Sequence, residues 1–143
     1  METRVLLADD HELVLDGLCA LLEREPGLVV IGRATDGPAA VERARMMEPD
    51  VVIMDLSMPG MSGTQATQRI KSDRPETRII CLSMHAQEQF VVAAIQAGAS
   101  GYILKDRAVG EVIQGIRAVM CGQMYFCPTI AKLLERSAKH VAK

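Results

Sequence analysis

The stretch Val51-Val52-Ile53-Met54-Asp55 consists of four consecutive apolar residues followed by a carboxylate. A run this short that is apolar at every position is typical of a strand buried on both faces, as in a parallel sheet, because a helix needs about ten residues or more. Similar short runs, each bounded by Asp, Gly or Pro, lie on either side of it. The sequence therefore predicts five strands, over residues 4–8, 28–34, 51–54, 78–82 and 101–104.

Segments with helical spacing of apolar residues separate these runs. Between the first two, Val14, Leu18, Leu21 and Leu22 recur at helical intervals, and comparable patterns follow the later strands. This strict alternation predicts an α/β fold in which helices cover both sides of a parallel sheet, because parallel strands require crossover connections.

The composition limits the class of protein. The chain has 143 residues, of which 49% are apolar, enough for one well-buried core and too few for two full domains. Its net charge of −2 offers no excess of basic residues for nucleic acid. Apolar runs stay far below the roughly 20 residues of a membrane span, and no signal-peptide pattern opens the chain, which predicts a cytoplasmic protein without membrane contact. The four cysteines show no metal-binding spacing and are expected to be reduced.

Chemically capable side chains follow four of the predicted strands. In strand order they are Asp9 with Asp10, Asp55, Ser83 and Lys105. Ligands of open parallel sheets bind beyond the carboxyl ends of the strands. We therefore expect these side chains to meet at one edge of the sheet.

Three carboxylates at one place repel one another unless a cation lies between them. Oxygen ligands without a nearby His or Cys favour Mg²⁺, with Mn²⁺ as the alternative. A carboxylate nucleophile, a metal, a lysine and a hydroxyl together indicate a phosphoryl-transfer site. For a single strand-terminal Asp the alternative is an N-cap, and that role stays open for Asp10 in a helix that begins near His11.

These residues lie in motifs that resemble the response regulator receiver domain, the CheY-like family of two-component signalling. The resemblance covers residue 4 to about residue 120, and its most specific pattern is D-x-x-M-P-x-x-x-G, which begins at Asp55. The other motifs are Val5-Leu6-Leu7-Ala8-Asp9-Asp10, Leu82-Ser83 and Gly98-Ala99-Ser100-Gly101-Tyr102-Ile103-Leu104-Lys105-Asp106. The resemblance implies a doubly wound (βα)5, flavodoxin-like three-layer sandwich with a five-stranded parallel sheet of order 2-1-3-4-5.

The resemblance also implies a role for each matching acidic residue. Asp55 would be the phosphoacceptor for a phosphohistidine on a sensor histidine kinase. Asp10 and Asp55, with the backbone carbonyl of Ser57, would hold Mg²⁺, and Asp9 would contact the metal through water. The chain would assist its own aspartyl phosphorylation and dephosphorylation without being a turnover enzyme.

Further residues are implied in the switch that follows. Lys105 and Ser83 would bind the phosphoryl group, and Tyr102 would turn inward as the Ser83 hydroxyl moves. The alternative for Tyr102 is a half-buried strand aromatic with its hydroxyl in water. Ser57 and His85 would line the approach of water and tune the phosphate lifetime, unless His85 is only a surface loop histidine.

The amino-acid sequence of these motifs is similar to that of the NarL/FixJ type of response regulator. Members of this type usually carry a C-terminal helix-turn-helix domain of the LuxR type. We therefore expect residues 1–121 to form the receiver. Residues 122–143 would be a linker with a helix opened by Pro128, leading to a DNA-binding domain that this chain lacks. DNA would be contacted only through that domain, and a homodimer is a further candidate assembly. Met84 departs from the family pattern, where a small residue is usual, and is expected to restrict access of small phosphodonors.

Two other functions stay open. A standalone receiver would act by docking to protein partners alone. A metal-dependent phosphohydrolase of the haloacid-dehalogenase type would use Asp55 as nucleophile, but it needs an acid at the position of Ser57. A nucleotide-binding module is disfavoured, because acids instead of a glycine-rich loop follow the first strand.

Overall fold

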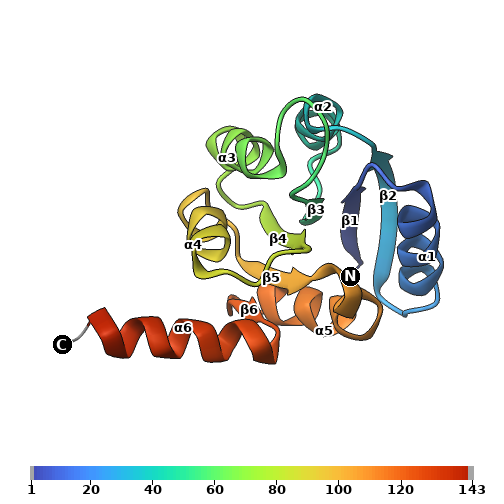
Figure 1. The fold of residues 1–143 in the computed structure, drawn as a ribbon. Helices are drawn as coiled ribbons and strands as arrows, with labels where there is room; N and C mark the ends of the chain where they lie inside the picture. Colours follow the sequence, from blue (N-terminus) through green and yellow to red (C-terminus); the bar gives the residue numbers. More distant parts are fainter. Residues whose placement is uncertain (1, 142–143) are drawn as a thin grey trace.

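The computed structural model describes residues 2–141, with side chains described for residues 2–136. Within that range parallel strands form a six-stranded sheet in the order β2-β1-β3-β4-β5-β6 (Figure 1). The strands are β1 (Thr3–Ala8), β2 (Leu28–Ala34), β3 (Val51–Asp55), β4 (Arg78–Ser83), β5 (Gly101–Leu104) and β6 (Tyr125–Phe126). The predicted order of the first five strands is confirmed.

Helices cover both faces of this sheet (Figure 1). They are α1 (Glu12–Glu23), α2 (Gly37–Met47), α3 (Gly63–Asp73), α4 (Glu88–Gln96), the short 3₁₀ helix η1 (Lys105–Arg107), α5 (Ala108–Met120) and α6 (Pro128–Val141). Buried side chains of α2, α3 and α4 form one core cluster with the sheet, and those of α1 and α5 form another. The fold is therefore the predicted three-layer α/β sandwich.

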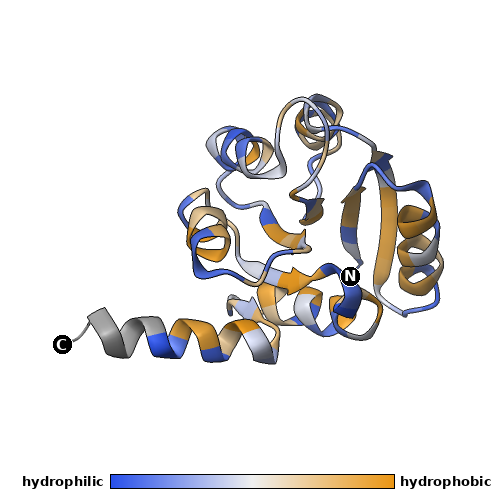
Figure 2. Cartoon of the chain, viewed as in Figure 1, coloured by the Kyte–Doolittle hydropathy of each residue, from blue (hydrophilic) through white to orange (hydrophobic). Residues whose placement is uncertain are grey.

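The central strands are apolar because both of their faces are covered. All five residues of β3 are buried. Along β1, Leu6 and Ala8 pack in the cluster on the α2–α4 side, whereas Val5 and Leu7 pack in the cluster on the α1–α5 side. Figure 2 shows the same pattern as hydrophobic colouring along the inner strands and on helix faces turned toward them. Burial on two faces explains why these strands show continuous rather than alternating hydrophobicity.

Two local features place the start of α3 against the end of β3. Ser62 and Gln65 form a capping box, in which the Gln65 amide donates to Ser62 Oγ and the Ser62 amide donates to Gln65 Oε1. A Cβ atom at Gly63 would lie 2.3 Å from the backbone oxygen of Asp55, so only glycine permits this approach. The loop between Asp55 and α3 is thereby closed tightly over the strand end.

The sixth strand was not predicted, because residues 122–143 were expected to form only a linker and a helix that begins at Pro128. β6 pairs with β5 in parallel, with Tyr102 opposite Phe126. The amide of Tyr125 donates to the carbonyl of Ser100 at 2.9 Å, and the amide of Cys127 donates to that of Tyr102 at 3.4 Å. A strand of two residues is too short to show any periodicity in the sequence. The sheet is therefore one strand wider than the predicted five.

The last helix begins at Pro128 as predicted and runs past α4 (Figure 1). Ile130 is fully buried, and Leu133 and Leu134 pack partly buried against the core cluster that includes α4. Residues 142–143 of the predicted linker lie outside the described residues. In the part of the chain that the structure describes, no helix combines the length and the apolar character that crossing a membrane requires.

Candidate functional site

Four strand ends bring polar side chains together at the carboxyl edge of the sheet, as predicted. Asp55 ends β3 and Ser83 ends β4, whereas Asp9 and Lys105 directly follow β1 and β5. Lys105 Nζ lies 3.1 Å from Asp9 Oδ2 and 3.2 Å from Asp55 Oδ2. One ammonium group therefore bridges carboxylates that are far apart in the sequence.

The two bridged carboxylates are removed from solvent, with Asp9 1% and Asp55 0% exposed. Burial is the largest single influence on the pKa of Lys105 and lowers it, but the contacts with Asp9 and Asp55 outweigh burial and leave the pKa raised. Lys105 therefore stays charged at neutral pH. Because Asp10 adjoins the same cluster, three carboxylates share this one lysine, and negative charge is in excess.

The donor atoms at this edge fit a divalent cation. Asp9 Oδ2 and Asp10 Oδ1 are buried and accept no hydrogen bond of good geometry, although Lys105 Nζ and His11 Nδ1 lie 3.1 and 3.0 Å from them. One ligand atom each of Asp9, Asp10, His11 and Asp55 lies within 4.8 Å of the others. Several carboxylate oxygens in so small a volume are the ligands that hard divalent cations prefer. The three predicted aspartates thus form a candidate metal site.

A histidine also belongs to this cluster, so the expectation that none lies near the carboxylates is wrong. His11 Nδ1 lies 3.0 Å from Asp10 Oδ1 and 3.2 Å from Asp9 Oδ1. The available sequence signal was its position directly after Asp10. His11 is itself the N-cap of α1, and that helix start has no side-chain cap hydrogen bond, so the alternative of Asp10 as N-cap is also wrong.

Asp55 is held from two sides. Its Oδ1 accepts a hydrogen bond from the Ser57 amide at 3.1 Å, and its Oδ2 accepts from Lys105 at 3.2 Å. Ser57 is exposed, so the loop after β3 connects the buried carboxylate with the surface. This arrangement fixes the orientation of the carboxylate beside an accessible loop.

An open depression of about 430 Å³ lies over this site and is lined by His11, Val14, Ser57, Met84, Lys105 and Asp106. Met84, the residue expected to restrict access of small phosphodonors, is 70% exposed and lines this depression. Lys105 and Ser57, the two residues that contact Asp55, both reach this depression.

Ser83, His85 and Tyr102 form a chain of hydrogen bonds on the other side of the site. Ser83 Oγ accepts from the His85 amide at 3.0 Å, and Tyr102 Oη donates to the His85 carbonyl at 2.7 Å. Tyr102 is completely buried, so the alternative of a half-buried aromatic with its hydroxyl in water is wrong. Burial raises the pKa of Tyr102, and the nearby Ser83 hydroxyl offsets part of that rise. The His85 ring stacks on Phe90, with centroids 4.2 Å apart, in the exposed β4–α4 loop.

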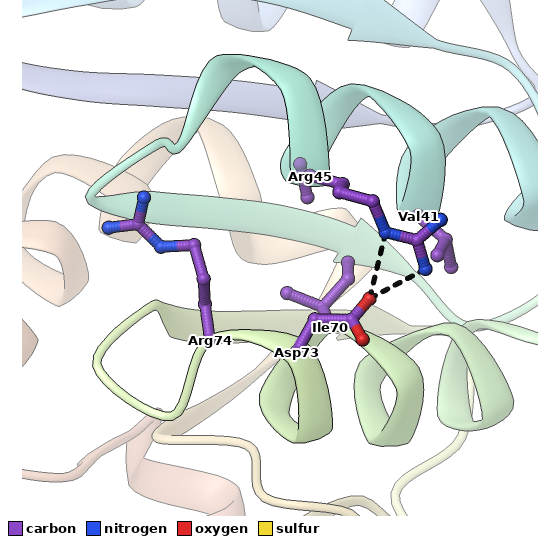
Figure 3. A pocket seen from close by; sticks show the side chains of 6 residues that line it. Val41, Arg45, Ile70, Asp73 and Arg74 are labelled. Carbon is purple, nitrogen blue, oxygen red and sulfur yellow. Dashed lines mark hydrogen bonds and ion pairs between the residues drawn. The ribbon is translucent and has the colours of Figure 1, made fainter.

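A second hollow, between α2 and α3, belongs to packing rather than to this site (Figure 3). There Arg45 donates to Asp73 Oδ2 from Nε at 3.3 Å and from Nη2 at 2.8 Å, above the apolar side chains of Val41 and Ile70. Both charged groups are substantially exposed, so the pair contributes little to stability.

The geometry can be compared with known proteins. The family model of the response regulator receiver domain matches residues 5–117. This chain belongs to that family. The receiver fold and the two-component character inferred from the motifs are confirmed.

The chain resembles longer response regulators over most of its own length. It is 39% identical over 131 residues to the response regulator GacA of Pseudomonas viridiflava, covering 92% of this chain and 61% of that protein. It is 42% identical over 133 residues to the response regulator UvrY of Escherichia coli K12, covering 93% of this chain and 61% of that protein. This chain therefore spans about three fifths of the length of these curated relatives.

Among solved structures, a two-component response regulator of the LuxR family from Aurantimonas superposes with a TM-score of 0.91. The sequence identity is 36%, and the match covers 96% of this chain and 99% of the other. That similarity extends beyond the residues matched by the family model and so includes part of the segment after α5.

Proposed function

We propose that Asp55 is phosphorylated by a sensor histidine kinase and that the phosphorylated receiver switches an attached effector. The position of Asp55 carries the proposal. Its fully buried carboxylate ends β3, with Lys105 Nζ 3.2 Å away and two further aspartates in the same cluster. Such a concentration of like charge is costly for folding and is typical of sites that hold a cation and a phosphoryl group.

In the proposed reaction, a carboxylate oxygen of Asp55 attacks the phosphorus of a phosphohistidine. A P–O bond forms, the P–N bond breaks, and the leaving imidazole takes up a proton. Lys105, already within reach of Asp55, neutralises phosphoryl oxygens. Asp10, Asp55 and the backbone carbonyl of Ser57 would hold Mg²⁺ or Mn²⁺, and Asp9 would contact the ion through water. The bound ion would supply positive charge that balances the same oxygens.

Phosphorylation adds roughly −1.5 to −2 charges and strong hydrogen-bond acceptors. We expect Ser83 to move toward these acceptors, because its hydroxyl lies at the neighbouring strand end. Movement of Ser83 would act on His85, because Ser83 Oγ accepts a hydrogen bond from the His85 amide. The carbonyl of His85 in turn accepts a hydrogen bond from Tyr102 Oη. Ser57 and His85 are proposed to control the approach of water, so that hydrolysis ends the signal and the domain is no turnover enzyme.

The support for a DNA-binding effector comes from the length of the related proteins and not from the structure of the receiver. We infer that residues 122–143 lead, in a longer protein, to a LuxR-type DNA-binding domain, and that DNA is contacted only there. The length of the GacA and UvrY proteins leaves room for such a domain. A homodimer and a cytoplasmic location are further parts of the proposal.

Incubation with a phosphoramidate and Mg²⁺ tests phosphorylation of Asp55. We expect one acid-stable, hydroxylamine-labile phosphate per chain, detected by intact mass. Asp55→Asn should abolish it, whereas the matched control Asp73→Asn, in the exposed pair with Arg45, should keep it. Equal labelling of Asp55→Asn contradicts the proposal. Multiple turnover of a phosphate ester would instead revive the phosphohydrolase.

A further inference from the structure

We propose that His11 supplies a nitrogen ligand to the cation site of Asp9, Asp10 and Asp55, so that the site selects divalent transition metals such as Ni²⁺ or Co²⁺ over Mg²⁺ more strongly than carboxylates alone would. The inference rests on the proposed cation site, and it concerns which metal the site prefers. It starts from the placement of His11 as the N-cap of α1, at the same sheet edge as the acids.

The contacts of His11 Nδ1 point to a cation. Nδ1 lies 3.0 Å from Asp10 Oδ1, 3.2 Å from Asp9 Oδ1 and 3.1 Å from Lys105 Nζ. Neither state of Nδ1 satisfies all three contacts. If Nδ1 carries a hydrogen, that hydrogen faces the Lys105 ammonium; if it carries a lone pair, the lone pair faces two carboxylate oxygens. A metal ion among these atoms is attracted by the lone pair and by both carboxylates at once.

The dimensions of the cluster agree with one coordination sphere. Donor atoms on opposite sides of an ion lie about 4.2 Å apart when each bond is about 2.1 Å long. The four candidate atoms lie within 4.8 Å of one another. A shift of a few tenths of an ångström brings those of Asp10, His11 and Asp55 into range, and Asp9 is close enough to contact the ion through water. Two residues of this cluster also carry a buried oxygen that accepts no hydrogen bond of good geometry, Asp9 Oδ2 and Asp10 Oδ1.

The chemistry of the donors sets the expected selectivity. Mg²⁺ prefers oxygen and keeps several waters, whereas imidazole nitrogen suits Ni²⁺, Co²⁺ and Zn²⁺. Loss of the imidazole should therefore weaken binding of transition metals and leave Mg²⁺ almost unaffected. A positioning role of His11 would weaken both alike, because it would act through the carboxylates.

The test compares Mg²⁺ and Ni²⁺ affinities by calorimetric titration of the full chain. His11→Asn is the informative variant, because Asn is a favoured N-cap residue and preserves the start of α1. The chain has three histidines, so His85→Asn/His140→Asn serves as the background in which His11 is the only imidazole. In that background His11→Asn should lower the Ni²⁺ affinity about tenfold or more and change the Mg²⁺ affinity less than about twofold.

A second measurement reports coordination directly. Added Zn²⁺ should shift the ¹⁵N resonance of His11 Nδ1 in the background variant, and Asp10→Asn should abolish that shift. Unchanged Ni²⁺ affinity in His11→Asn, equal losses for Ni²⁺ and Mg²⁺, or absence of the ¹⁵N shift would each overturn the inference and leave the proposed function intact. Absence of any Mg²⁺ binding to the wild-type chain would overturn the proposed cation site itself.

Discussion

Tyr102 donates a hydrogen bond from Oη to the backbone carbonyl of His85 at 2.7 Å, and the amide of that same His85 donates to Ser83 Oγ at 3.0 Å. The backbone of one loop residue thus connects a hydroxyl at the carboxyl edge of the sheet with a phenol buried on β5. Because Tyr102 is completely buried, the proposed movement of Ser83 would reach the interior of the domain through these two hydrogen bonds.

Tyr102→Phe should separate stability from switching. The variant loses one hydrogen bond and is expected to unfold in urea with about 1 kcal/mol less stability. Tyr125→Phe is the matched control, because Tyr125 Oη donates to Glu111 at 2.6 Å on α5. Both variants should lose similar stability, but only Tyr102→Phe should reduce the phosphorylation-dependent shift of the His85 amide resonance. Equal shifts in both variants would exclude a role for the phenol in the switch.

The ionisation of tyrosine is a direct test of the buried phenols. Burial is the main cause that raises the pKa of Tyr102, and burial together with Glu111 raises that of Tyr125, above the ordinary value of 10.0. Because the folded pKa values exceed the unfolded ones, the stability that these groups contribute is complete below about pH 10 and is lost as the pH rises through the folded values. The chain has two tyrosines and no tryptophan, so tyrosinate absorbance reports on them alone. Half-ionisation near pH 10 in the folded protein would contradict this expectation. In urea, where the chain is unfolded, the tyrosines should be half-ionised at about pH 10.

The four cysteines should react at very different rates. All are free, and only Cys121 is exposed. Burial raises the pKa of Cys81 to about 12, which keeps its thiol protonated at pH 8. We expect one thiol to react rapidly with a disulfide reagent in the folded chain and four to react in urea. Cys121→Ser should abolish the rapid phase, and a rapid phase that persists in this variant would show that a buried cysteine opens readily.

Gly101→Ala should weaken the pairing of β6 with β5. A Cβ atom at Gly101 would lie 3.0 Å from the carbonyl oxygen of Tyr125 and 3.2 Å from Ile80 Cγ1. The control is Gly110→Ala on α5, where a Cβ atom has no neighbour within 4 Å and the helix gains about 1 kcal/mol in propensity. Hydrogen exchange should show that the amides of Tyr125 and Cys127 lose protection in the first variant only. Retained protection in Gly101→Ala would show that β5 and β6 adjust together.

Loss of β6 should also release the last helix. Cys127 and Ile130 are buried in the cluster that contains Tyr102, and they anchor the start of α6. In the wild-type chain we expect amides in the first turns of α6 to exchange more slowly than those farther along it, because protection there depends on docking. Uniform protection along α6 equal to that of β3 would contradict this docking-dependent order.

The sequence was most informative where packing is strongest. β1 to β5 could be predicted because burial on two faces requires unbroken apolar runs, and Asp9, Asp55 and Lys105 could be placed because parallel strands end at one edge. β6 could not, because two residues carry no period and their pairing depends on backbone groups of Ser100 and Tyr102.

The contacts of the site that the sequence did not predict were missed for a different reason. The role of His11 in the cluster depends on distances of 3.0–3.2 Å that no spacing rule gives. The buried hydrogen bond of Tyr102 likewise depends on the path of the β4–α4 loop and not on the identity of His85, since its backbone makes both bonds.

The short strand β6 also affects how the chain tolerates shortening. Without it, β5 would present unpaired amide and carbonyl groups along an open margin of the sheet, which is a template for edge-to-edge self-association. A chain cut after Met120 would therefore be prone to aggregate, although every predicted strand and every candidate phosphorylation residue would still be present.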